Sequence, residues 1–476
     1  MSKRSRITLA SASVAIFMVT LDNLVVTTAL PSIRRDLGAS LEDLEWTVNG
    51  YTLAFAVFLL TGAALGDRFG RRRMFLIGLG IFTGASALAA LAPSTDALIA
   101  ARAIQGLGGA IVAPLTLTLL SEAFPADKRG LALGIWSGIG GLAVAMGPLA
   151  GGAIIESISW QWIFWVNVPV GLALLPLARR GLVESHGPAG RLDLPGVALV
   201  TTGLFGLVFG LVRGQGDGWG SPLIVASIAS GAVLLAAFVA WERRTPQPMV
   251  PLDLFRRRAF AVTNGVSFFM YFGTFGSIFL ITQFVQQVMG YAPFEAGVRM
   301  LVWTGATAIA SPIAGVLAER YGPRPFMAAG LALQGGALAW LAAISVPDVA
   351  YSSLVLPFAM AGAGMALVFA PSANAVLGSV EQASAGQASG ATNAIRELGG
   401  VMGIAVLASV FSTHGSYASP QAYTDGMVSA VWVGAAVLAA GALVALLIPR
   451  AAGRGTAPAA APAPVPVPAV AEPVAA

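Results

Sequence analysis

The sequence predicts an all-α polytopic membrane protein with about 14 transmembrane helices, and three observations lead to this fold class. First, 57% of the 476 residues are hydrophobic and only 10% are charged, whereas soluble domains average about 25% charged residues. So few charges could not cover a soluble fold of this size, so lipid must surround most of the exterior. The second observation is a series of long apolar segments, and the third is the distribution of basic residues between them.

Each candidate span was identified by length, because a transmembrane helix needs about 20 mostly apolar residues. The basic N-terminus resembles the start of a signal peptide, but the following apolar run is long and contains Asp22, so we expect a retained first span. Fourteen candidates begin near Thr8, Trp46, Met74, Ala97, Leu131, Trp160, Leu194, Pro222, Ala259, Ala296, Phe326, Tyr351, Gln387 and Met427.

The basic residues predict the orientation. With an even number of spans both termini lie on one side, and most arginines fall in the loops of that side. They include Lys3, Arg4, Arg6, Arg71, Arg72, Arg73, Arg179, Arg180, Arg243, Arg244, Arg320 and Arg324. Basic residues mark cytoplasmic loops, so we expect a multi-pass protein of a bacterial inner (plasma) membrane with both termini cytoplasmic. Short basic clusters between spans also argue against nucleic acid as the partner of the net charge of +5.

The domain organisation follows if the seventh and eighth spans are an insertion. We expect an N-terminal six-helix bundle at residues 1–180 and a linker at 181–258 that carries two additional transmembrane helices. A C-terminal six-helix bundle would occupy residues 259–450. The Ala/Pro/Val composition of residues 451–476 predicts a disordered tail.

An internal repeat supports this division. Residues 63–73 and 315–325 share the pattern small–x–Leu–small–acid–Arg–aromatic–Gly. The first copy follows span two and the second follows span ten, which are equivalent places in two six-span halves once the insertion is removed. Two related bundles around a central site are the usual plan of alternating-access carriers.

The repeat also predicts a conformational latch, which we define as Asp67, Arg68, Gly70 and Arg71 with Glu319, Arg320 and Gly322. An acid at a helix end can pair with an arginine or with the start of a neighbouring helix. Such contacts could hold one conformation and break in the other. The alternative is that the arginines only fix the topology.

Four further segments carry a family resemblance: residues 98–110 with Arg102, residues 143–152 with Gly147, Pro148, Gly151 and Gly152, residues 21–31 with Asp22, and residues 160–171. In their order along the chain, and together with the repeat, these segments resemble the major facilitator superfamily, specifically its fourteen-span drug/proton antiporter branch. The resemblance implies two six-helix bundles plus two extra central helices. The motif at 143–152 is associated in that family with exporters. The mid-span Gly147–Pro148 pair predicts a hinge or a tight helix seam, with simple small-residue packing as the alternative.

Four charged residues lie deep inside spans, where a charge is costly and is a functional candidate. From the rise of about 1.5 Å per residue, Asp22 and Arg102 could meet in the outer half of the N-terminal bundle. A pair that separates during transport would change the proton affinity of its carboxylate. We therefore expect Asp22 to be the principal protonation site and Arg102 to modulate it. The alternative is a static ion pair that only locks two helices.

The other two deep charges are Arg396 and Glu397 in span thirteen. Because the family resemblance implies an amide at position 397, Glu397 is an additional carboxylate. It could be a second proton-coupling site or a countercharge for a cationic substrate, unless Arg396 neutralises it locally.

A substrate cavity walled by aromatic and polar groups would accept varied apolar ligands and cations. Our candidates, each of which could instead face lipid or the helix core, are Trp46, Asn49, Trp136, Tyr271, Trp303, Asn393 and Arg396.

Taken together, these features predict proton-coupled efflux of small hydrophobic compounds such as antibiotics, cationic ones included, by a monomer that uses alternating access. The alternative is an uptake symporter or facilitator for a small metabolite. The absence of cysteine, the two scattered histidines and the lack of a catalytic constellation or phosphate-binding loop argue against an enzyme, a metal site or a cofactor.

Overall fold

The computed structural model describes residues 2–39, 41–187, 193–246, 248–381 and 384–449. The described segments are helices and short connections, with no strand among them, which confirms the predicted all-α class. The predicted Ala/Pro/Val tail at 451–476 lies outside the described residues.

Long helices account for the predicted spans. In chain order the elements are α1 (Lys3–Leu37), α2 (Leu41–Phe69), α3 (Arg71–Ala90), α4 (Thr95–Ala123), α5 (Ala126–Ser157), α6 (Trp162–Trp165), α7 (Asn167–Gly181), α8 (Leu194–Asp217), α9 (Pro222–Glu242), α10 (Asp253–Arg256), α11 (Arg258–Gln283), the π-helical turn η1 (Phe284–Val288), α12 (Pro293–Tyr321), α13 (Pro323–Ile344), α14 (Tyr351–Gly378), α15 (Ala385–His414) and α16 (Pro420–Ala445). Among the described residues, thirteen helical segments are long and apolar enough to cross a membrane. The 32-residue helix α5 is not one of the thirteen, and it brings the count to the predicted fourteen.

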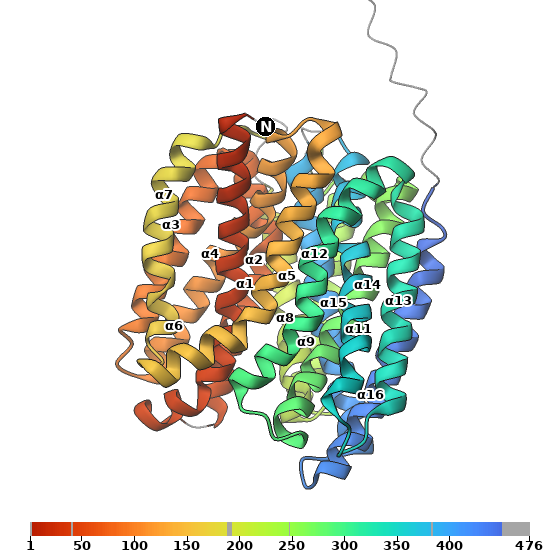
Figure 1. Ribbon diagram of the computed structural model, residues 1–476. Helices are drawn as coiled ribbons and strands as arrows, with labels where there is room; N and C mark the ends of the chain where they lie inside the picture. The colour runs from red at the N-terminus through yellow and green to blue at the C-terminus, as the bar shows by residue number, and fades with distance from the viewer. Residues whose placement is uncertain (1, 40, 188–192, 247, 382–383, 450–476) are drawn as a thin grey trace, which may run out of the picture.

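The helices lie side by side, and α1 begins at the same end of the molecule at which α16 finishes (Figure 1). This arrangement follows from an even number of spans. The loop between α2 and α3 and the loop between α12 and α13 lie at that end too, and both carry arginines. We therefore call it the basic end.

Buried apolar side chains form separate cores in the two halves of the sequence. Two clusters draw their buried members from residues 15–182 and 25–164, both within α1–α7 and the segment that follows α7. The largest cluster lies entirely within residues 266–448, from α11 to the end of α16. Helices α1–α7 and helices α11–α16 thus each pack around cores of their own.

The two bundles meet along α5 and α12 with almost no side chains between the backbones. A Cβ atom on Gly134 would lie 2.7 Å from Cα of Pro312, and one on Gly138 would lie 2.9 Å from the Ala308 carbonyl oxygen. Membrane helices approach this closely only at small residues. We call this contact the glycine seam; its glycines are Gly130, Gly134, Gly138, Gly297 and Gly315.

A cluster of apolar side chains closes the basic end between the bundles, and we call it the seal. None of its buried members is more than 5% exposed, so the protein is closed at this end. They are Ala12, Leu117, Leu120, Phe124, Ala132, Leu133 and Trp136 of the N-terminal bundle with Ala373, Leu377 and Ala385 of the C-terminal bundle.

Helix α8, the first of the two additional helices, packs against both bundles. Val200, Leu204 and Val208 of α8 belong to a buried cluster whose other members include residues of α2 and α15. The hydroxyl groups of Thr61 on α2 and Thr201 on α8 are hydrogen bonded at 3.2 Å. Helix α9 packs on α8 and exposes apolar side chains such as Leu223, Val225 and Val233, as expected of a lipid-facing helix.

Candidate functional site

The Asp22 carboxylate on α1 is buried at the centre of a polar network, with only 1% of the residue exposed. Its Oδ2 accepts a hydrogen bond from fully buried Arg102 of α4. Its Oδ1 accepts hydrogen bonds from the side-chain amides of Gln105 at 2.8 Å and Asn167 at 2.6 Å. The structure therefore brings the predicted pair together, inside the bundle rather than towards lipid, and surrounds Asp22 with three donors from two other helices.

Gln105 and Asn167 were not predicted from the sequence. Both are amides within the segments 98–110 and 160–171 that carry the family resemblance, and an amide inside a membrane span is the signal that could have found them. Gln105 also donates to the Ser86 hydroxyl at 2.7 Å, so the network extends to α3.

Arg102 has contacts that do not depend on Asp22. Its Nε donates to the Thr47 carbonyl oxygen at 3.2 Å, its Nη1 also donates to Gln105 at 2.7 Å, and its guanidinium lies 4.3 Å from the centre of the Tyr51 ring. Within the described residues its Nη2 has no hydrogen-bond partner. These contacts hold the guanidinium independently of its bond to Asp22.

The first latch copy forms a buried chain of alternating charges. Arg71, which is 1% exposed, donates from Nε to Asp67 at 2.7 Å and from Nη1 to Glu122 at the end of α4. Glu122 was not predicted as a latch residue because it follows a different span. Arg68, by contrast, is exposed, with its guanidinium 6.0 Å from the ring of Phe69.

Asp67 also reaches the opposite bundle. Its carboxylate lies against the first turn of α15, so close that Gly386 has no room for a side chain. The backbone N–H of Gln387 lies beside the same carboxylate. A negative charge is favourable at a helix N-terminus, so this contact draws α15 towards α2 at the basic end.

The second latch copy mirrors this contact with a different partner. Glu319 at the end of α12 accepts a hydrogen bond from the backbone N–H of Gly130, in the first turns of α5. Arg320 is exposed, and its guanidinium lies 5.3 Å from the ring of Tyr321. Gly322 links α12 to α13 with φ +86°, a conformation that favours glycine. Each acid of the repeat therefore lies at the start of a helix in the other bundle.

The glycines of the 143–152 motif pack α5 against two helices. A Cβ on Gly147 would lie 2.6 Å from Cβ of Leu24, and Gly151 faces Val25 and Thr28 of the same helix α1. Gly152 instead faces Phe294 of α12. The side chain of Pro148 lies outside the described part of α5. The motif thus forms a tight helix seam within the N-terminal bundle and touches the other bundle at one point.

In the C-terminal bundle, Arg396 and Glu397 differ in their surroundings. Arg396 is buried, donates to the Ser372 hydroxyl at 2.9 Å and lies about equally far from the Tyr271 and Phe369 rings, 5.8 and 5.9 Å from their centres. Glu397 is half-buried and has no hydrogen bond or ion pair with any residue that the structure describes. Glu397 lies near Arg396 and near Tyr51 and Tyr271, one tyrosine from each bundle.

Among the predicted cavity residues, Tyr271, Asn49 and Asn393 are half-buried, and Tyr271 stacks on Phe275 with ring centres 5.0 Å apart. Asn393 donates to the Ser389 carbonyl oxygen at 2.9 Å.

The predicted tryptophans are placed differently. Trp303 is 0% exposed and packs on Phe358 in the C-terminal core, and Trp136 belongs to the seal. Trp46 packs on Phe209 of α8, 6.0 Å between ring centres. In this conformation Trp303 and Trp136 are core residues. The sequence could not show this, because nothing in it separates a core face from a cavity face on an apolar helix.

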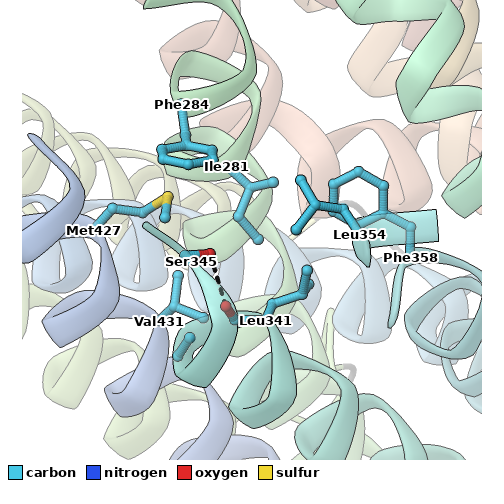
Figure 2. A pocket seen from close by; sticks show the side chains of 9 residues that line it. Ile281, Phe284, Leu341, Ser345, Leu354, Phe358, Met427 and Val431 are labelled. Atoms are coloured by element: carbon cyan, nitrogen blue, oxygen red, sulfur yellow. Dashed lines mark hydrogen bonds between the residues drawn. The ribbon is translucent and has the colours of Figure 1, made fainter. Parts of the chain in front are cut away.

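The apolar pocket in Figure 2 is too small for a substrate. It holds about 10 Å³ between α11, η1, α13, α14 and α16, about the space of a single water molecule. Its walls are apolar except for Ser345, whose hydroxyl is bonded to the Leu341 carbonyl oxygen at 2.7 Å. It is a packing void of the C-terminal core.

Solved structures with the same fold are transporters. The chain superposes on a proton:xylose symporter with a TM-score of 0.68 and 16% identity, covering 94% of this chain and 97% of that one. The human organic anion transporter MFSD10 gives a TM-score of 0.67 at 14% identity, with 94% and 100% covered. At such low identity these matches show the fold alone.

Sequence relatives are closer. A cephamycin export protein of Amycolatopsis lactamdurans is 38% identical, over 87% of this chain and 86% of the relative. A tetracenomycin C resistance and export protein of Streptomyces glaucescens is 35% identical over 84% and 74%, and a methylenomycin A resistance protein of Bacillus subtilis is 30% identical over 88% and 91%. The family model for the Major Facilitator Superfamily matches residues 12–404 and, in a second match, 263–473. The three relatives named above are resistance or export proteins, and the chain belongs to the major facilitator superfamily.

Proposed function

We propose that the protein exports small hydrophobic compounds, such as antibiotics, out of the cytoplasm in exchange for protons, and that it does so as a monomer. Relatives whose names describe antibiotic export or resistance align with most of the chain at 30–38% identity. The arginines at the basic end support an orientation in which both termini are cytoplasmic.

The observation that carries the proton coupling is the environment of Asp22. The carboxylate accepts hydrogen bonds from α4 and α7 while it sits on α1. Because those donors belong to separate helices, a movement of the bundle changes how well the charged form is stabilised, and with it the proton affinity. A proton bound at Asp22 would in turn weaken the bond to Arg102 and favour the other arrangement.

The closed basic end supports a place for this conformation in the proposed cycle. If that end faces the cytoplasm, the seal excludes the cytoplasm, and the conformation belongs to the part of the cycle in which cargo leaves and a proton enters from outside.

We propose Glu397 as a second coupling group or as a countercharge for cationic cargo, since within the described residues it forms no hydrogen bond or salt bridge and lies near tyrosines of both bundles as well as Arg396.

The test is export by everted membrane vesicles that contain the Asp22→Asn variant, with ethidium as the cationic probe. Asparagine keeps the size of the side chain but cannot carry a proton as a carboxyl group does. We expect probe uptake driven by a proton gradient to be lost in this variant and unchanged in Asp96→Asn, whose parent residue is exposed at the start of α4. Normal proton-driven uptake by Asp22→Asn would contradict the assignment, provided that both variants reach the membrane in equal amounts.

A further inference from the structure

The segment that leaves α7 lies against the first latch copy. Oε1 of Glu184 accepts a hydrogen bond from the backbone N–H of Arg72 at 2.9 Å, and Oε2 accepts one from that of Arg73 at 3.2 Å. The carbonyl oxygen of Ser185 accepts the N–H of Arg71 at 2.9 Å. The first three N–H groups of α3 are therefore all satisfied by residues more than a hundred positions away.

Helix α3 needs this external support because of its own start. The first N–H groups of a helix have no partner inside it, and a Ser, Thr, Asp or Asn at the cap usually supplies one. The cap residue of α3 is Gly70, which has no side chain to offer and adopts φ +102°. A Cβ at Gly70 would lie 2.8 Å from the Glu184 carboxylate, so the glycine also makes room for the distant cap.

The same segment touches the other members of the latch. The backbone N–H of Gly187 donates to the Asp67 carbonyl oxygen at 2.9 Å. The Ser185 hydroxyl donates to Glu122, the carboxylate that also binds Arg71. Residues 184–187 therefore contact each member of the charge chain, and we call them the strap.

The second latch copy provides an internal comparison. Helix α13 begins with Pro323, Arg324 and Pro325, and proline has no N–H to satisfy. Where α3 presents three N–H groups in its first three positions, α13 presents one. The copy that has a strap is the copy whose helix start requires one.

We propose that Glu184 is a positioning residue for export: by capping α3 it holds Arg71 where the guanidinium neutralises Asp67, and so keeps the seal closed. This inference rests on the proposed alternating access. The strap also leads directly to the additional helices. In the segment that follows α9, the Pro248 carbonyl oxygen accepts a hydrogen bond at 3.1 Å from the side-chain amide of Gln387, whose backbone N–H lies beside Asp67. The chain segments on both sides of α8 and α9 thus border the latch.

The chain contains no cysteine, so a single Leu377→Cys reporter in the seal can be labelled with a maleimide in everted vesicles, without substrate or proton gradient. In the Glu184→Ala background we expect labelling to be about three- to thirty-fold faster, the shift that corresponds to losing one helix cap. Asp67→Asn should accelerate labelling as a positive control. Asp253→Ala should not, because Asp253 is an exposed carboxylate at the start of α10.

Labelling of Glu184→Ala at the parent rate, while Asp67→Asn accelerates it, would overturn the proposal. If Glu184→Ala is too scarce in the membrane, Glu184→Gln takes its place, since it keeps one acceptor oxygen. A smaller but clear acceleration would support the proposal, and the parent rate would contradict it. A loss of folded protein alone does not change the labelling rate of the molecules that remain. Failure of proton-driven export in Asp22→Asn is measured separately and leaves this result unaffected.

Discussion

The two copies of the latch share a sequence pattern but achieve their contacts differently. In both, an acid at the end of one helix lies at the start of a helix in the other bundle: Asp67 at α15 and Glu319 at α5. The first copy adds a buried arginine, a second carboxylate and the strap, whereas in the second copy Glu319 lies near half-buried Arg129 at the start of α5, and α13 begins with prolines. Charge therefore acts at both copies, and the clearest difference is how the start of the following helix, α3 or α13, is satisfied.

The comparison is tested most directly by removing each acid in turn. Asp67→Asn leaves the buried Arg71 short of one partner, which we expect to cost the closed conformation about 3 kcal/mol. Glu319→Gln loses a charged acceptor for the Gly130 N–H and the attraction to half-buried Arg129, which is screened by solvent, and it should cost about 1 kcal/mol. Maleimide labelling of Leu377→Cys would then rise about a hundredfold in the first variant and about fivefold in the second. Equal increases would show that the two copies contribute alike.

The two linking glycines give a smaller contrast. Gly70 and Gly322 both have positive φ, so alanine at either position should strain the backbone by about 1–2 kcal/mol. Alanine at 70 also meets the Glu184 carboxylate, and we expect it to lower the thermal midpoint of the detergent-purified protein more than alanine at 322. Removing that carboxylate with Glu184→Ala should bring the two midpoints closer. A larger loss at position 322 would be inconsistent with the strap.

The smallest effect is expected where the second copy needs no cap. Pro325→Ala returns an N–H to the first turn of α13 and loosens the unfolded chain, which should destabilise the protein by about 0.5 kcal/mol. The labelling rate of Leu377→Cys should not change. A labelling increase comparable to that of Glu184→Ala would mean that the start of α13 controls the seal as strongly as the start of α3.

The sequence was most informative where polar groups interrupt apolar helices. Asp22 and Arg102 could be placed in the same outer half of the bundle from the rise per residue alone, and the acids of the repeat could be assigned to helix ends. Trp46, Trp136 and Trp303 could not be assigned a direction, because a span is apolar towards lipid and towards its neighbours alike. The role of Glu184 was hidden for another reason: its partners are backbone N–H groups, which leave no trace in the side-chain pattern.

The glycine seam has a mechanical consequence for the transport cycle. Where Gly130 faces Gly315 and Gly134 faces Pro312, no interdigitated side chains have to disengage before one helix can roll over the other. Rotation of one helix over the other along this interface should therefore meet little steric resistance. The energetic barrier to each turnover would then lie mainly at the basic end, where the charges of the latch and the apolar seal must separate before the bundles can rotate.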